Sequence, residues 1–189
     1  MEIYRGHATA GIKTAATISP EEIRKIVQVG KMKHKQQRRS YCPINFALES
    51  FGDPWSLLII RDIVYFGKKT YGEFFASEEG IATNILASRL AQMEKLGIIA
   101  KRQSKTEKRK EEYTLTEKGL DIIPLLVEMA SWSALHDPET AAPADWIALC
   151  NARKSEMIQM IRETVRDGGA VFVGPGSVLS KLAGEEQQM

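Results

Sequence analysis

The residues best suited to chemistry in this chain are a run of cations and a row of small polar side chains that precedes it. Six of the ten residues from 101 to 110 are Lys or Arg, and Glu107 is the one acid among them. Cations at this density can bind nucleic-acid phosphates, with an affinity that falls steeply as salt rises. A solvated, charged loop is the alternative interpretation. The cations are Lys101, Arg102, Lys105, Lys108, Arg109 and Lys110.

The polar side chains lie on one face of a helix predicted over residues 83–96. Its apolar residues recur at helical spacing and should pack inward; they are Ile85, Leu90, Met93 and Leu96, with help from Leu86. The outward residues are Thr83, Asn84, Ala87, Ser88, Ala91 and Gln92, with Arg89 near the boundary. This face is small enough to enter a DNA groove, where Asn84 could bind a base edge. Thr83 and Ser88 could reach a phosphate or a base, and Arg89 could clamp a phosphate. A solvated face with Arg89 in a structural ion pair remains open.

Neighbouring segments predict a helix-turn-helix that positions this face. Thr70 and Glu73 have the spacing of a capping box, which starts a short helix over residues 70–77. The tight, glycine-containing turn before Thr83 makes the two helices a candidate DNA-binding pair. Two short strands follow, Ile98–Ser104 and residues 112–115, joined by a charged connection. A basic hairpin directly after the second helix makes the fold a winged helix, whose wing would reach the flanking backbone or minor groove.

Helices before and after the hairpin should supply the core and the interface with a second copy. Pro43 opens one helix, closed by Gly52, and Pro54 opens a strongly apolar helix to Phe66 that we expect to be buried and central. We also expect Tyr65, Phe66, Phe74 and Phe75 to be core residues. A helix over 117–135 should kink or restart at Pro124. It has more apolar side chains than one face can bury, which predicts a homodimer.

The remaining segments are expected to be extensions of this domain. Residues 1–40 are predicted to form an N-terminal extension with a short helix and a basic arm, and Met32 is an alternative start. Residues 41–136 are the winged helix-turn-helix domain and 137–143 a linker rich in Pro and Ala. Residues 144–167 are predicted to form one amphipathic helix. The Gly-rich residues 168–189 are predicted to be a flexible tail.

Composition excludes several classes of protein. The apolar runs are too short to span a membrane, no signal peptide is apparent, and a cytoplasmic location follows. Residues 31–116 carry 16 Lys or Arg against 10 Asp or Glu, whereas residues 117–189 carry 6 against 11. The first region therefore suits a polyanion and the second would repel one. The three histidines lack metal-site spacing, and no nucleophile–base arrangement or phosphate-binding glycine loop is present. We expect no enzyme activity, cofactor or metal.

Three segments, in the same order, resemble HxlR-type transcriptional regulators, over about residues 41–135. They are Cys42-Pro43 with Gly52-Asp53-Pro54-Trp55 through Arg61, Gly80-Ile-Ala-Thr-Asn84 through Leu90, and Tyr113 through Gly119. The resemblance implies a mainly α, MarR/HxlR-like winged helix with a small β-hairpin, which binds double-stranded DNA as a homodimer and regulates transcription. It also implies that the N-terminal and post-wing helices form the dimer interface. Ala82, Ala87 and Ala91 replace charged or polar residues usual in that family, so this helix should read fewer bases directly.

The sequence leaves the regulation of the protein open. The resemblance implies that Cys42 could be a redox or electrophile sensor, and a helix N-terminus beside Arg38 and Arg39 would favour its thiolate. Inert packing at a dimer interface is the competing interpretation for Cys42, and Cys150 on the C-terminal helix should be buried. The winged helix could also serve protein interaction, or the chain could be a regulator that encloses an unknown small-molecule effector.

Overall fold

The structure, a computed structural model, describes residues 39–104, 107 and 109–186. The predicted N-terminal helix, all of the basic arm before Arg39, and the wing residues Lys105 and Lys108 lie outside these residues. Internal contacts divide the chain into two units, residues 1–47 and 48–189. Apart from the start of α2, the elements below belong to the second unit.

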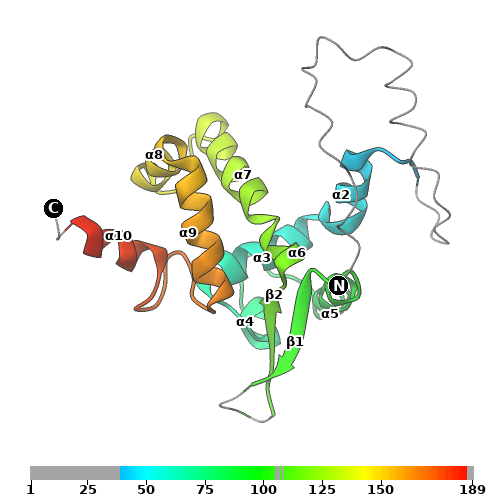
Figure 1. Cartoon of the computed structure of the whole chain (residues 1–189). Coiled ribbons are helices and arrows are strands. Elements are labelled where there is room, and N and C mark those ends of the chain that lie inside the picture. The colour runs from blue at the N-terminus through cyan, green and yellow to red at the C-terminus, as the bar shows by residue number, and fades with distance from the viewer. Residues whose placement is uncertain (1–38, 105–106, 108, 187–189) are drawn as a thin grey trace, which may run out of the picture. The chain divides into compact units, whose positions relative to one another are not determined.

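The described residues form helices with one two-stranded antiparallel sheet, as the sequence predicted (Figure 1). The helices before the sheet are α2 (Pro43–Phe51), α3 (Pro54–Phe66), α4 (Tyr71–Phe75) and α5 (Thr83–Lys95). The strands are β1 (Ile99–Gln103) and β2 (Glu111–Leu115). The helices after it are α6 (Glu117–Leu120), α7 (Ile123–His136), α8 (Ala144–Ala152), α9 (Lys154–Arg166) and α10 (Val178–Glu186).

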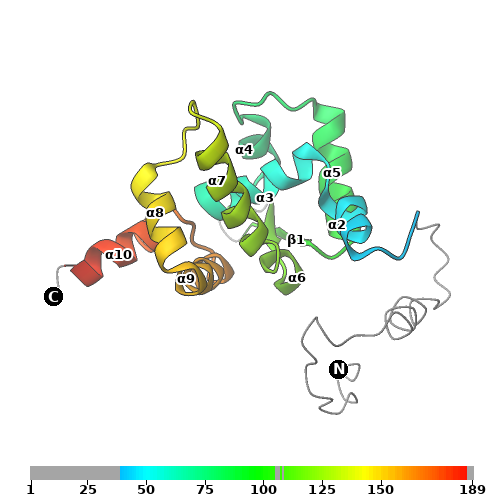
Figure 2. The same ribbon diagram turned by 90° about the horizontal axis from the view of Figure 1, so that it is seen from above.

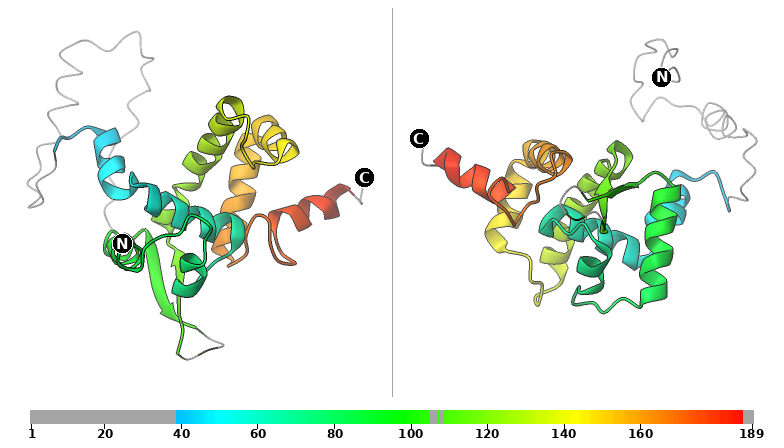
Figure 3. Two further views of the ribbon diagram at one scale, coloured as in Figure 1. Left: turned by 180° about the vertical axis from the view of Figure 1, so that it is seen from behind. Right: turned by 90° about the horizontal axis from the view of Figure 1, so that it is seen from below.

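Helix α3 is the buried centre of the second unit, as predicted. The Asp53 side chain caps its start by accepting a hydrogen bond of 3.0 Å from the Ser56 N–H. Gly67 ends it in the left-handed conformation, with φ of 63°, which an L side chain rarely adopts. α3 lies between α5 on one side and the group of α7, α8 and α9 on the other (Figures 2 and 3). Its buried side chains therefore join both halves of the core.

The aromatic residues at the ends of α3 and α4 are partly buried in the core and partly exposed at the surface. Tyr65 and Phe74 are buried, as expected from the sequence. Phe66 and Phe75 are exposed, so the expectation that they belong to the core is wrong. Both are the last residues of their helices, where the buried face gives way to solvent.

The helix-turn-helix and the hairpin are joined by contacts at the start of α4. Thr70 and Glu73 form the predicted capping box. The backbone at Lys69 and Thr70 also pairs with β2: the Tyr113 N–H donates to the Lys69 carbonyl over 2.7 Å, and Thr70 bridges to Glu112. Tyr71, the first residue of α4, contacts the start of α5, because its hydroxyl donates to the Thr83 carbonyl over 2.9 Å. These contacts fix α4 against both α5 and the hairpin.

The chain leaves the hairpin through a tightly packed turn. Thr116 caps α6 by accepting from the Gly119 N–H, and its hydroxyl donates to the Gly97 carbonyl over 2.6 Å. A Cβ at Gly119 would lie 2.2 Å from the Ile98 carbonyl oxygen, so only glycine fits there. The helix predicted over 117–135 is interrupted near Pro124, as expected, and α7 begins at Ile123. Pro124 occupies the first turn of α7, where its missing N–H costs no helical hydrogen bond.

The C-terminal helix predicted as one piece over 144–167 is two helices, so that prediction is wrong. The chain bends at Arg153, whose φ of −122° and ψ of 40° lie outside the helical region. No Gly or Pro marks the bend, and the apolar spacing would suit a continuous helix. Both α8 and α9 pack on α7, so tertiary packing outweighs the local preference here.

Residues 168–186 do not form the predicted flexible tail, because the segment around Val171 pairs with the end of α3 and α10 contacts α9. The N–H groups of Val171 and Phe172 donate to the carbonyls of Val64 and Tyr65, over 2.9 and 3.0 Å. These carbonyls belong to the last turn of α3, where intrahelical partners are lacking. Val171 and Val178 are fully buried, and α10 follows. The glycines that suggested disorder instead permit turns, since Gly168 and Gly174 have φ of 85° and 91°.

Candidate nucleic-acid interface

Helix α5 presents the face that the sequence predicted. Thr83, Asn84 and Ser88 are exposed, together with Ala87 and Ala91. The inward side differs from the prediction, because Leu86 is fully buried whereas Ile85 and Leu96 are only half-buried. Leu86 is therefore a principal core residue, with Leu90 and Met93, rather than a helper. The outward face is uncharged and its side chains are short.

The start of α5 adds a feature that sequence reasoning missed. Ala82 is its N-cap and offers no side chain to accept a hydrogen bond. The first N–H groups of a helix lack intrahelical partners, and together with the helix dipole they attract anions. Because Ala82, Thr83 and Asn84 are exposed, this end of the helix is open to a phosphate group. The sequence did contain a signal for this open N-terminus, because Ala82, which cannot cap a helix with its side chain, directly precedes the polar face.

Arg89 lies in a different setting from the exposed residues. Its Nη1 donates to the Gln92 side-chain oxygen over 3.0 Å and lies 3.5 Å from the Asp53 carboxylate. The side chain is 28% exposed, and its Nε is buried with no hydrogen-bond partner in the described part of the chain. The structure thus brings Arg89, Gln92 and Asp53 together, which favours the structural role left open for Arg89.

The wing cations are less available than their number suggests. Lys101 pairs with Glu111 at 2.7 Å and Lys110 with Glu107 at 2.8 Å, and each hydrogen bond raises the pKa of the lysine. Arg102 stands opposite Glu112 in the strand register. The basic run of residues 101–110 is followed directly by two acids, Glu111 and Glu112, which begin β2 and face the cations of β1. Among the described residues, Arg102 and Arg109 have no recorded ion pair.

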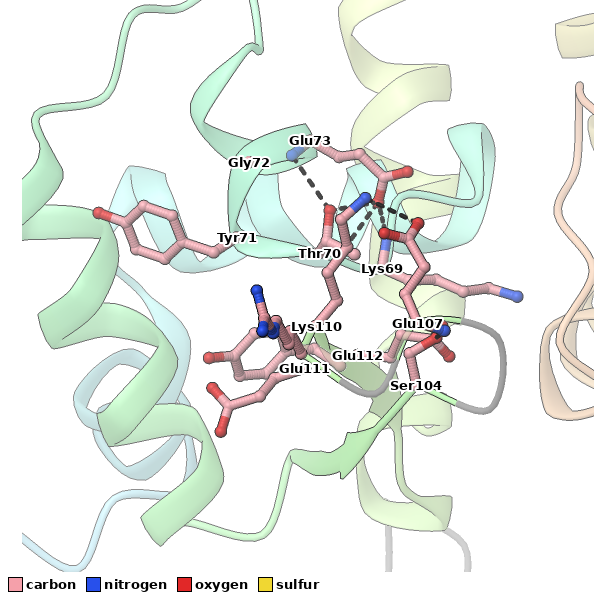
Figure 4. A pocket seen from close by; sticks show the side chains of 12 residues that line it. Lys69, Thr70, Tyr71, Gly72, Glu73, Ser104, Glu107, Lys110, Glu111 and Glu112 are labelled. Carbon is pink, nitrogen blue, oxygen red and sulfur yellow. Dashed lines mark hydrogen bonds and ion pairs between the residues drawn. The ribbon is translucent and has the colours of Figure 1, made fainter.

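A groove of about 670 Å³ separates the start of α4 from the hairpin (Figure 4). The capping box lies on one side, and Glu107, Lys110 and Glu111 lie on the other. Burial alone would raise the pKa of Glu73, but hydrogen bonds from the N–H groups of Lys69 and Thr70 lower it overall. With Glu112, the groove is lined by four acids and by three cations, Lys69, Arg109 and Lys110, so it has no excess of positive charge for a phosphate. The hairpin edge and the outer face of α5 are the surfaces left for an anion.

The structure also describes both cysteines and one of the three histidines. Cys42 is a free, exposed thiol, while Cys150 is buried as expected, and burial raises its pKa to about 11. The His136 ring lies 4.8 Å from the Trp132 ring, whereas His7 and His34 fall outside the described residues. Within the described ranges, no group of three or more His, Cys, Asp or Glu could hold a metal ion. Nor is any helix there long and apolar enough to cross a membrane.

These elements define a winged helix-turn-helix: the helix pair α4 and α5 is followed in the chain by the β1–β2 hairpin and then by α6. Residues 50–140 match the family model described as HxlR-like helix-turn-helix, and the chain belongs to this family of transcriptional regulators.

Individual relatives agree with this assignment. The chain is 30% identical over 115 residues to MT3179 of Mycobacterium tuberculosis, an uncharacterised HTH-type transcriptional regulator, covering 61% of this chain and 70% of that one. It is also 30% identical over 91 residues to YdeP of Bacillus subtilis, another uncharacterised HTH-type regulator, covering 48% and 70% of the two chains. Among solved structures, PA1607, a candidate transcription factor, has a TM-score of 0.50 and 35% identity, covering 55% of this chain and 72% of that one.

Proposed function

We propose that this regulator binds specific DNA sequences as a homodimer, with α5 in the major groove and the wing on the flanking backbone or minor groove. One observation carries the proposal: α5 opens at an uncapped, exposed N-terminus and continues as a face of short polar side chains. A helix needs such a face to approach base edges closely. Nothing in this role requires catalysis.

Base selection would rest on few side chains. Asn84 is the best candidate, because an amide can donate to and accept from a base edge at once. Thr83 and Ser88 are exposed on the same face and can add contacts to phosphates or bases. Arg89 donates a hydrogen bond to Gln92, so we propose that these two residues mainly help to hold α5 in its orientation. A phosphate contact by Arg89 would be a secondary role.

The wing would supply affinity rather than sequence choice. Arg102 and Arg109 are the described cations free to meet a phosphate, and Lys101 and Lys110 would first have to leave their glutamates. Lys105 and Lys108 are assigned to the same role from the sequence alone. Such contacts release counterions from DNA, so they make binding strongly dependent on salt.

The proposed dimer interface is an apolar stripe on α7. Leu125, Met129, Trp132 and Leu135 recur on one side of the helix and are exposed, with Trp132 at 66% and Leu135 at 77%. Exposed apolar rows of this kind mark protein interfaces, and a two-fold copy of the same chain is the commonest partner. A two-fold dimer would address half-sites roughly one helical turn of DNA, about 34 Å, apart.

Selection of genomic fragments by the full chain, at low and high salt, tests the proposal. We expect sequence-selective retention at high salt. Asn84→Ala should change which fragments are preferred, whereas Asn151→Ala, an exposed asparagine on α8, should leave the preference unchanged. Binding without selectivity would contradict the proposal. No DNA binding at all would favour a protein-interaction module instead.

The dimer is tested separately by sedimentation. Trp132→Glu should produce monomers and weaken operator binding, because the charge would be buried between two apolar stripes. Leu179→Glu, at an exposed apolar residue of α10, is the matched control and should leave the dimer intact. An unchanged dimer in Trp132→Glu would place the interface elsewhere.

The role of Cys42 as a redox or electrophile sensor remains a prediction. DNA binding that is insensitive to oxidant would exclude this role.

A further inference from the structure

A second cavity, of about 430 Å³, lies away from the wing, between α3, α7 and the C-terminal region. Its walls are mainly apolar, and they include Tyr65, Phe66, Met129, Trp146 and Phe172. The family match ends at residue 140, so α3 and α7 contribute family segments while Trp146 and Phe172 come from beyond the match. The cavity therefore lies where segments of the family match meet the part of this chain beyond it.

Phe172 organises the aromatic wall of the cavity. Its ring stacks on Tyr65 with centroids 5.4 Å apart and meets the edge of Trp146 at 5.3 Å. The Phe66 ring lies 6.2 Å away and is tilted. The backbone hydrogen bond from Phe172 to the end of α3 holds this cluster in place. Rings offering both faces and edges favour a flat aromatic occupant, through offset stacking and T-shaped contacts.

Tyr65 adds one polar group to this wall. The residue is 8% exposed, and its hydroxyl has no hydrogen-bond partner recorded among the described residues. Burial raises the pKa of Tyr65 to about 12, so the hydroxyl keeps its proton and is available as a donor. The hydroxyl oxygen is not one of the fully buried polar atoms that lack a partner, so it is accessible from the cavity, and a carbonyl or similar acceptor of an occupant could accept its hydrogen bond.

The charges at the rim are already balanced. Arg61 lines the cavity, but its guanidinium hydrogen-bonds to both Asp62 and Glu79. Lys68 adds a further ion pair to Asp62 at 2.9 Å. Two cations thus face two carboxylates, which leaves no free positive charge for an anionic occupant. Burying a ligand carboxylate without a partner would be unfavourable.

We propose that this cavity binds a small, uncharged aromatic compound that carries a hydrogen-bond acceptor for Tyr65. Its volume falls in the range of small-molecule sites, which are mostly apolar with a few placed polar groups. The proposal concerns binding alone and does not depend on DNA recognition.

Calorimetry on the full chain with three related probes tests this site. They are 2-acetylnaphthalene, 2-ethylnaphthalene, which lacks the acceptor, and the anion naphthalene-2-carboxylate. The ketone should bind once per chain, about threefold to tenfold more tightly than the ethyl compound. The carboxylate should bind at least about tenfold more weakly than the ketone.

Variants locate the binding. Tyr65→Phe should remove the preference for the ketone over the ethyl compound and leave the latter's affinity unchanged. Ala142→Leu fills a half-buried position of the wall and should weaken both by about tenfold or more. Ala148→Leu makes the same change at an exposed position of α8 outside the cavity and should have no effect.

Three results would overturn the proposal. One is the absence of ketone binding to the folded chain. Another is equal binding of ketone and carboxylate, and a third is unchanged ketone binding in Ala142→Leu. If the ketone fails to bind and Ala142→Leu shifts the monomer–dimer equilibrium instead, a second copy of the chain covers the cavity.

Discussion

The cations of the wing and those of residues 144–186 differ in how completely they are paired. Each Lys or Arg of the C-terminal region has a partner: Arg153 with Glu156, Lys154 with Glu128, Arg162 with Asp121, Arg166 with Glu117 and Lys181 with Thr164. Three of these link α9 to α6 or α7, so they attach the C-terminal region to the winged helix. In the wing, Arg102 and Arg109 have no recorded ion pair in the described part of the chain. Availability, rather than residue type, therefore separates a candidate DNA contact from a structural one.

The acids show a parallel contrast. Asp62, at the end of α3, has a side chain only 3% exposed and binds Arg61, Lys68 and the Ser77 hydroxyl. Glu117 and Asp121, which hold α9, have side chains 68% and 69% exposed. Water therefore screens the ion pairs of Glu117 and Asp121, whereas it hardly reaches the carboxylate of Asp62. The same kind of ion pair should therefore contribute very different free energies in the two regions.

The largest predicted effect is at the buried carboxylate. Asp62→Ala should lower the free energy of unfolding by about 3 kcal/mol, because Lys68 and Ser77 lose a buried partner. Denaturant unfolding at fixed protein concentration measures it. Asp121→Ala is the exposed counterpart and should cost less than about 1 kcal/mol. Equal losses in the two variants would show that burial does not distinguish these regions.

The next effect is on the affinity of the wing for DNA. Replacing both Arg102 and Arg109 by Ala should weaken binding to all sequences by roughly tenfold or more, and should reduce the salt slope by about two per chain. Replacing Lys101 and Lys110 removes the same net charge but only cations already paired with glutamates. We expect a smaller change in slope for that pair, measured by fluorescence anisotropy across salt concentrations. Identical slopes would mean that the ion pairs open on DNA.

The same contrast explains what the sequence could predict. Local signals were sufficient where a side chain acts on its own backbone, as in the Asp53 cap, the Thr70–Glu73 capping box and the break near Pro124. The outward face of α5 followed from helical spacing alone. These features depend on residues three or four positions apart, which a sequence displays directly.

Features set by distant partners were missed. The bend at Arg153 arises where two helices pack on α7, and no residue at the bend signals it. The Phe172 N–H donates to the carbonyl of Tyr65 on α3, which lies over a hundred residues earlier in the chain. Pairing of Lys101 with Glu111 depends on strand register, which a count along the sequence does not include. Contacts of this kind join residues that are distant in the sequence, so they can be inferred only once the fold is known.

The smallest predicted effect concerns the exposed ion pairs that attach α9. A hydrogen bond from Arg166 lowers the pKa of Glu117 below its usual value, so this contact contributes stability above the usual pKa of a glutamate and loses it as the pH falls through the lowered value. Arg166→Ala should raise the pKa of Glu117 toward the usual value, as followed by NMR titration, without changing DNA affinity. Arg153→Ala is the matched control, because a hydrogen bond from Arg153 lowers the pKa of Glu156, a different carboxylate on α9 itself. It should shift Glu156 and leave Glu117 unchanged. If Arg166→Ala instead weakened DNA binding as much as the wing variants do, the cations of the C-terminal region would not be purely structural.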